Sequence, residues 1–214
     1  MKLEKALVKF KLESYLLVVG MMIAGLALPG FAQAGKAEQQ PPAFPRIAYD
    51  ERAWKEFEST DGGFAIAFPG KPGFKTHTVQ ALAGPLVNHI YGLDIGVAFF
   101  AATYTDMPLP VPAGDKELIN LALDAGRDRA LSGTASQLIS EEPISLDGYI
   151  GRGSFYSSPD GSLTHNRNYI VGNRLYQLVV VSDDFRKSPA EDRKFFKGLI
   201  NRFFASFKLT RKAY

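Results

Sequence analysis

The 214-residue sequence contains no cysteine. Thiolate nucleophiles, thiolate metal sites and disulfide bonds are therefore excluded. Membrane anchoring through an acylated cysteine behind a signal segment is excluded as well. Any folded domain in this chain must be stabilised by its hydrophobic core without covalent cross-links.

The sequence also lacks the short motifs that mark common catalytic and cofactor sites. No HExxH, EF-hand, GxSxG or GxGxxG pattern occurs. The segment that starts at Gly70 resembles the beginning of a phosphate-binding loop. However, Phe74 stands where such a loop needs a glycine before Lys75, so the backbone amides cannot cradle a phosphate. We therefore assign no catalytic residue and no cofactor, and we favour a protein that is not an enzyme.

One long apolar run lies near the N-terminus, at residues 16–28, behind a segment that holds four lysines. Ala32-Gln33-Ala34 then supplies the small residues of a signal-peptidase site. Pro29-Gly30 ends the run early, which leaves it short for a membrane span. The pattern predicts a signal peptide over residues 1–34 and export to the periplasm or cell envelope. An uncleaved N-terminal helix in the cytoplasmic membrane is the alternative.

Removing residues 1–34 from the 214 leaves 180, which suits a single domain. The net charge then falls from +3 to +1, because the leader holds four Lys and two Glu. The basic character of the chain thus gives little support for nucleic-acid binding. We expect a proline-rich linker over 35–53, one domain over 54–209 and a basic tail over 210–214.

Strand patterns dominate the chain after the leader. Two β-rich runs around Gly172-Asn173 predict a hairpin with a type II′ turn, because glycine provides the positive φ of the first central position. Pairing outward from this turn places Tyr169 opposite Tyr176. The second run, 175–181, is apolar at nearly every position, which is typical of a central strand covered on both faces.

Two helices are expected among the strands. Asp115 caps the first. Ser188 is expected to cap the second, with Pro189 at the first helical position and Glu191 completing a capping box. Phe203 lies in an apolar stripe of the second helix, which we expect to pack on the sheet. A basic amphipathic helix lying on a membrane is the alternative. The other expected strands cover 54–58, 64–68, 75–81, 85–93, 96–105, 137–146 and 149–157.

Runs of hairpin-linked strands with helices between them indicate an α+β domain with a mainly antiparallel β-sheet flanked by helices. The chain carries, in order, Trp54 and Phe57, Asp61-Gly62-Gly63-Phe64, Phe68-Pro69-Gly70-Lys71-Pro72, Gly148-Tyr149-Ile150-Gly151-Arg152, Arg174-Leu175-Tyr176-Gln177-Leu178 and Phe203-Phe204-Ala205-Ser206-Phe207-Lys208-Leu209. Together these motifs resemble small exported bacterial proteins of unassigned function with the PsbP-like fold. The extrinsic photosystem II protein and the Ran-binding Mog proteins share this fold. The resemblance covers 54–209 and implies an α/β/α sandwich, but it implies no activity.

Two of the three histidines are expected to meet across a second hairpin. A three-residue loop Leu82-Ala83-Gly84 would place His77 opposite His89. Two imidazoles about 5 Å apart can hold a divalent metal or titrate as a pair. The sequence places no third ligand beside them, and metal sites usually need one. We therefore assign no metal site, and histidines that are packed or hydrogen-bonded remain the alternative.

A group of cationic residues marks a candidate binding surface. The register of the hairpin at Gly172 puts His165, Arg167 and Arg174 on one face of the sheet, and Arg152 can join them from a neighbouring strand. Such a surface would bind an acidic partner or an anionic ligand. A solvated sheet edge is the alternative.

These patterns favour a non-enzymatic exported binding or assembly module of the cell envelope. Its partner is expected to be an envelope protein or a small anionic ligand, and not a nucleic acid. Membrane contact is expected only if the N-terminal segment stays uncleaved. A hydrolase or lipid-active enzyme without a recognisable local motif is the alternative.

Overall fold

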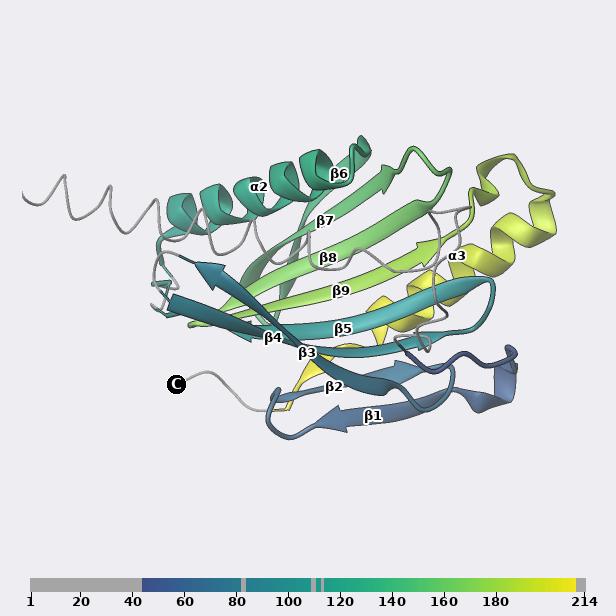
Figure 1. The fold of residues 1–214 in the computed structure, drawn as a ribbon, viewed down its shortest axis with the longest axis horizontal. Helices are drawn as coiled ribbons and strands as arrows, with labels where there is room; N and C mark the ends of the chain where they lie inside the picture. Colours follow the sequence, from purple (N-terminus) through teal and green to yellow (C-terminus); the bar gives the residue numbers. More distant parts are fainter. Residues whose placement is uncertain (1–43, 82–83, 109–110, 113, 211–214) are drawn as a thin grey trace, which may run out of the picture.

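The computed structural model of the chain describes residues 44–81, 84–108, 111–112 and 114–210. In these residues, ten strands form two sheets and two α-helices pack against them (Figure 1). Neighbouring strands pair in the antiparallel sense throughout both sheets. The α+β class with a mainly antiparallel sheet, predicted from the sequence, is confirmed.

A seven-stranded sheet with the order β3-β4-β5-β9-β8-β7-β6 forms the centre of the molecule. The strand β9 holds the middle position, as its apolar pattern predicts. The strands of this sheet are β3 (Gly73–Ala81), β4 (Gly84–Asp94), β5 (Ala98–Asp106), β6 (Gln137–Leu146), β7 (Tyr149–Ser157), β8 (Leu163–Val171) and β9 (Arg174–Ser182).

The β8–β9 hairpin has the predicted register. Gly172 has a φ of 61°, which suits the first central position of its turn, and Tyr169 pairs with Tyr176. Both tyrosine rings contact Phe207, with ring centroids 6.1 and 5.6 Å away. The tyrosine pair therefore joins the core through a third aromatic residue.

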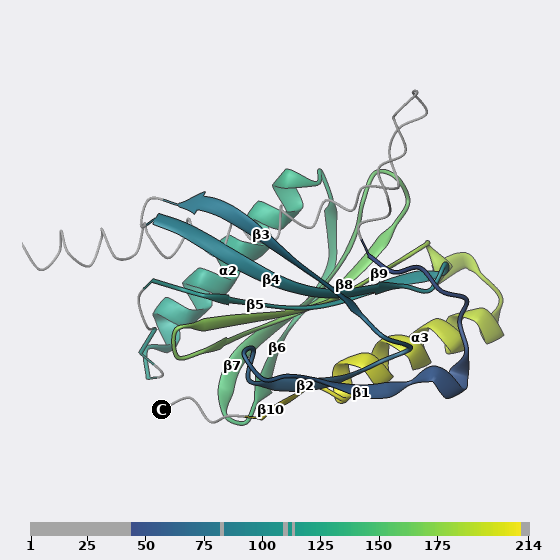
Figure 2. The ribbon, with the colours of Figure 1, turned by 60° about the horizontal axis from the view of Figure 1, so that its bottom comes forward.

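A smaller sheet packs on one face of the large sheet. It consists of β1 (Lys55–Ser59), β2 (Phe64–Phe68) and the two-residue β10 (Lys208–Leu209), in the order β1-β2-β10. The helix α3 (Ala190–Ala205) lies beside β1 and β2, as Figure 2 shows. The large sheet lies between helices, as expected for an α/β/α sandwich. On the face covered by α3, however, the small sheet completes the layer, and the sequence did not predict this second sheet.

The helix α2 (Lys116–Gly133) packs on the opposite face of the large sheet. Its N-cap is Asp115, whose side chain accepts a hydrogen bond from the Leu118 amide at 3.0 Å, as predicted. Ile119 and Leu123 are buried at its inner face.

The predicted N-cap of α3 is wrong. Pro189 holds the N-cap position, and no side chain forms a cap hydrogen bond there. Ser188 instead ends the preceding 3-10 turn η2 (Phe185–Lys187), where its amide donates to the carbonyl oxygen of Phe185 at 3.1 Å. In a capping box, the Glu191 side chain would accept a hydrogen bond from the Ser188 amide. This amide is already bonded to Phe185, so the capping box does not form.

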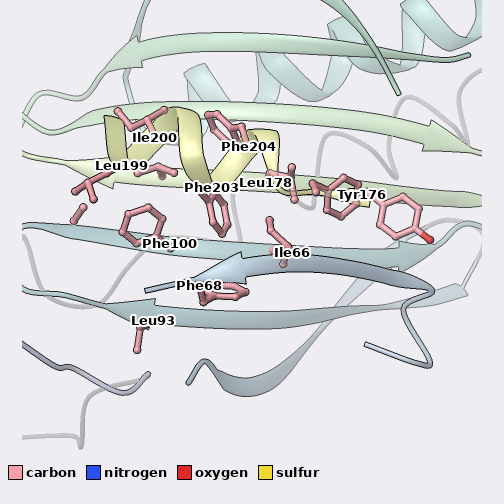
Figure 3. Close-up of a cluster of buried hydrophobic side chains, with 14 of the residues drawn as sticks. Ile66, Phe68, Leu93, Phe100, Tyr176, Leu178, Leu199, Ile200, Phe203 and Phe204 are labelled. Atoms are coloured by element: carbon pink, nitrogen blue, oxygen red, sulfur yellow. The ribbon is translucent and has the colours of Figure 1, made fainter. Parts of the chain in front are cut away.

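The main core lies between α3, the small sheet and one face of the large sheet. Phe203 is fully buried, and Figure 3 shows its ring pointing from α3 toward Phe100 and Phe68. The ring centroids are 5.2 Å and 5.3 Å away, respectively. The apolar stripe of α3 therefore packs on the sheets, although Phe195 near the start of the helix stays 40% exposed.

Part of the expected linker packs on the large sheet. The Ile47 amide donates to the Asp94 carbonyl and the Asp94 amide donates to the Pro45 carbonyl, each at 2.9 Å. Phe44 packs on Phe99 with ring centroids 5.4 Å apart. Ordered structure thus begins before Trp54. Three segments lie outside the described residues: the predicted signal peptide, residues 35–43 and the end of the basic tail. Among the described residues, no helix combines the length and apolar character of a membrane span.

Candidate functional site

The predicted histidine pair does not form. The β3–β4 hairpin pairs His77 with Asn88 and closes with Ala81 opposite Gly84, so its connection has two residues and not three. The register therefore differs by one residue from the prediction, and His77 and His89 lie on opposite faces of the hairpin. In the part of the chain that the structure describes, no three side chains of the metal-binding types gather in one place.

His89 is packed between aromatic rings. It stacks on Tyr104 with a centroid distance of 4.4 Å and an interplanar angle of 2°. Phe74 lies on its other side at 6.1 Å. This arrangement matches the packed alternative for His89, while His77 is exposed on the edge strand β3.

Arg174 holds the two sheets together. Its Nε and Nη2 donate to the two carboxylate oxygens of Asp106 at 2.6 and 2.8 Å. Its Nη1 donates to the carbonyl oxygens of Asp61 and Gly62, both at 2.8 Å, in the turn between β1 and β2. The guanidinium also lies 4.6 Å from the centroid of the Tyr104 ring. Hydrogen bonding to Asp106 raises the pKa of Arg174. These partners take four of the five N–H donors of the guanidinium, so Arg174 is a structural residue.

Arg152 lies on the face opposite to the other three cationic residues, because β7 pairs Arg152 with Asn168. Its Nη1 donates to Asp124 of α2 at 2.6 Å and to Glu141 of β6 at 2.8 Å. Arg127 of α2 donates to the same two carboxylates. The grouping of Arg152 with the predicted cationic surface is therefore wrong, and its ion pairs fasten α2 to β6 and β7.

His165 and Arg167 do share one face of β8, and it is the face covered by α3 and not a solvated edge. Both side chains line a pocket of about 260 Å³ between α3 and the strands β6, β7 and β8. The residues that line this pocket, called the α3 pocket below, are Ser140, Glu141, Glu142, Gly153, Ser154, Phe155, His165, Asn166, Arg167, Ile200, Asn201 and Phe204.

A glycine forms the floor of the α3 pocket. Glu142, Gly153 and Arg167 are directly opposed on three neighbouring strands, in that order. Because Gly153 has no side chain, the Glu142 side chain of β6 can extend over the backbone of β7 on the face that carries Arg167. A Cβ atom on Gly153 would lie 3.2 Å from Cγ of Glu142, so Glu142 leans over the floor.

Arg167 combines partial burial with the lack of an anionic partner. Its guanidinium carbon lies 4.8 Å from the centroid of the Phe204 ring, a cation–π contact that fixes the plane of the group. Among the ion pairs of the described residues, none includes Arg167. The Tyr169 hydroxyl is a side-chain partner of Arg167. No carboxylate competes for the other guanidinium donors, which are available to a ligand in the pocket.

His165 is a neutral residue of the pocket wall. Its ring stacks on Phe155 at 4.1 Å and on Phe185 at 6.1 Å. Burial lowers the pKa of His165 to about 4, so the imidazole carries no charge at neutral pH. Its Nε2 is buried without a hydrogen-bond partner, which costs about 1–3 kcal/mol.

The sequence reading missed the other polar residues of the pocket, which are Ser140, Glu141, Glu142, Ser154, Asn166 and Asn201. Most of them come from β6 and α3, and local patterns do not show where these elements meet β8. One signal was present, because an isolated glycine inside a strand, such as Gly153, often marks the close approach of a ligand or another chain segment.

No protein-family model and no curated protein sequence matches the chain. Among solved structures, the chain is similar to the solution structure of the cyanobacterial PsbP protein from Synechocystis, with 14% sequence identity and a TM-score of 0.48. That match covers 82% of this chain and 98% of the other. A protein of unknown function from Pseudomonas aeruginosa matches with 8% identity and a TM-score of 0.34, covering 68% of this chain and 93% of the other. At these identities and TM-scores, neither likeness says anything about the function of this chain.

Proposed function

We propose that this protein is an exported, non-enzymatic module of the cell envelope that binds a small anionic ligand in the α3 pocket. The observation that carries the proposal is the environment of Arg167. Its guanidinium lies against the Phe204 ring in a pocket of about 260 Å³, and no carboxylate in the described part of the chain pairs with it. Arg152 and Arg174, in contrast, are neutralised by carboxylates of the chain itself.

The chemistry of Arg167 selects the class of ligand. A guanidinium forms two parallel hydrogen bonds to a carboxylate, and charge-assisted bonds of this kind are about twice as strong as neutral ones. The contact with the Phe204 ring restricts the guanidinium before the ligand arrives, which reduces the entropy lost on binding. Ligand pockets for drug-sized molecules occupy roughly 300–1,000 Å³, so the smaller α3 pocket favours a compact ligand.

Export is supported by the N-terminal pattern of lysines, a short apolar run and Ala32-Gln33-Ala34. The lack of cysteine leaves nothing to cross-link in an oxidising compartment. An envelope protein as partner stays a prediction, and co-purification of one stoichiometric protein tests it. Nothing in the described residues specifically favours the hydrolase alternative.

Isothermal titration calorimetry with 4-methylpentanoate, a small carboxylate with an apolar chain, tests the proposed binding. We expect Arg167→Gln to weaken binding at least about tenfold, which corresponds to 1.4 kcal/mol, because the variant cannot pair with the carboxylate. Arg129→Gln is the matched control, since it removes one positive charge from an exposed position on α2. An affinity that is the same in Arg167→Gln and the unmodified protein would contradict the proposal.

A further inference from the structure

The α3 pocket has a second charged wall that the proposed anionic ligand does not use. Glu142 Oε1 lies 3.4 Å from the position that a Cβ of Gly153 would occupy, so its carboxylate reaches over the pocket floor. Glu141, the next residue along β6, points to the opposite face and accepts hydrogen bonds from Arg152. Glu142 has no such partner among the ion pairs of the described residues.

We infer that the natural ligand of the α3 pocket is a small zwitterion, an α-amino acid with an aliphatic side chain. This inference rests on the proposed function, because it keeps the ligand carboxylate on Arg167. The ligand ammonium group pairs with Glu142 on the other side of Gly153. Ser140 and Asn201 supply neutral hydrogen-bonding groups at the same pocket.

The spacing of the two charged walls fits this class. Neighbouring strands lie about 4.8 Å apart, so the backbones at Glu142 and Arg167 are about 10 Å apart across the strand of Gly153. Both side chains lie on the same face and reach toward the space above this glycine. Each charge-assisted hydrogen bond to the ligand takes up about 2.8 Å. Glu142 Oε1 lies 3.4 Å from the position of a Cβ on Gly153, so its carboxylate stands above the strand next to Arg167. The two charged groups of the ligand must therefore be close together, as they are on one carbon atom.

The remaining walls of the pocket explain the aliphatic side chain. Ile200 and Phe204 of α3 and Phe155 of β7 line the pocket beside the two charged groups. Apolar surface of the ligand that they cover is removed from water, which favours binding. The charged walls thus orient the ligand, and the apolar walls select its side chain.

Three ligands of one shape separate the contributions of the two charges. L-leucine carries both charged groups, 4-methylpentanoate carries only the carboxylate, and 3-methylbutylamine carries only the ammonium group. Binding of each to the purified protein is measured by calorimetry at neutral pH. We expect leucine to bind at least about tenfold more tightly than either partial ligand, since only leucine can pair with both Glu142 and Arg167.

Substituting Glu142 and Arg167 one at a time then shows which charged group of the ligand each residue binds. Glu142→Gln should weaken leucine binding at least about tenfold and should leave 4-methylpentanoate bound as well as before, or better, because a like charge is removed. Arg167→Gln should weaken both. Glu142 is exposed, so the variant should fold, and Glu117→Gln on the exposed surface of α2 is the control.

The outcomes distinguish the two proposals. If leucine binds no more tightly than 4-methylpentanoate while Arg167→Gln still weakens both, the zwitterion is overturned and the anionic site stands. Leucine binding that is unchanged in Glu142→Gln has the same meaning. If neither carboxylate ligand binds, both proposals are overturned.

Discussion

The role of each arginine and histidine on the large sheet depends on the residues that surround it. Arg174 and Arg152 are held by carboxylates of the chain, and His165 is kept neutral by burial between aromatic rings. Arg167 faces an aromatic ring on one side and the open pocket on the other. One face of the large sheet thus carries Arg174, which stabilises the fold, and Arg167, which is available to a ligand.

The buried imidazole of His165 should make the folded state sensitive to acid. Its pKa is about 4 in the folded protein, compared with 6.5 for an unperturbed histidine, so the unfolded state takes up a proton first as the pH falls. Stability should therefore be lost between about pH 6.5 and pH 4, by at most about 3 kcal/mol. In urea melts at pH 7.5 and pH 4.5, His165→Phe should lose less stability on acidification than the unmodified protein. Equal losses in both proteins would show that His165 is not buried in its neutral form.

At the scale of elements, the two hairpins show why one register could be predicted and the other could not. Gly172 needs a positive φ and the flanking runs are buried, so only one register of β8–β9 satisfies both. The edge strand β3 is exposed on both faces at most positions, so burial does not choose between registers there. A loop shorter by one residue therefore moved His77 away from His89.

Some residues of the candidate site could be predicted from the sequence, and others could not. His165 and Arg167 could be found because they lie on a hairpin whose faces the local pattern determines. Glu142 and Asn201 could not, because β6 and α3 reach the pocket through long-range packing. Such packing depends on contacts among distant segments and leaves no periodic signal in either segment.

The packing of α3 on the sheets predicts unequal costs for two phenylalanines of one stripe. Phe203→Ala should lower the free energy of unfolding by about 3–5 kcal/mol, because Phe203 is fully buried between the two sheets. Phe195→Ala, at a position that is 40% exposed, should cost less than about 1 kcal/mol. Denaturant melts of both variants check this difference. A small loss for Phe203→Ala would mean that this face of α3 is not packed, and would revive the membrane-bound helix.

At the scale of the whole molecule, the location of the pocket follows from how one sheet face is covered. The small sheet packs over β4 and β5, where Phe57 contacts Tyr91 and Phe64 contacts Tyr104. The helix α3 continues this layer as far as β8, where Phe204 meets Arg167. The α3 pocket lies at the border between α3 and the strands β6 and β7.

Export of the protein depends on the N-terminal segment that precedes the folded domain. We expect the mature protein to begin at Gly35 and to occur outside the cytoplasmic membrane, because Ala32-Gln33-Ala34 fits a signal-peptidase site. N-terminal sequencing of the protein from fractionated cells measures this. Intact residues 1–34 on a membrane-bound form would support the anchor instead.

The central claim is that a small carboxylate binds in the α3 pocket through Arg167. Two-dimensional ¹H–¹⁵N NMR of the purified protein during titration with 4-methylpentanoate tests it most directly, because each amide reports its own position. The account predicts saturating shifts concentrated at Gly153, Arg167 and Asn201, and their loss in Arg167→Gln. Spectra that stay unchanged, or shifts that gather elsewhere and persist in Arg167→Gln, would contradict it.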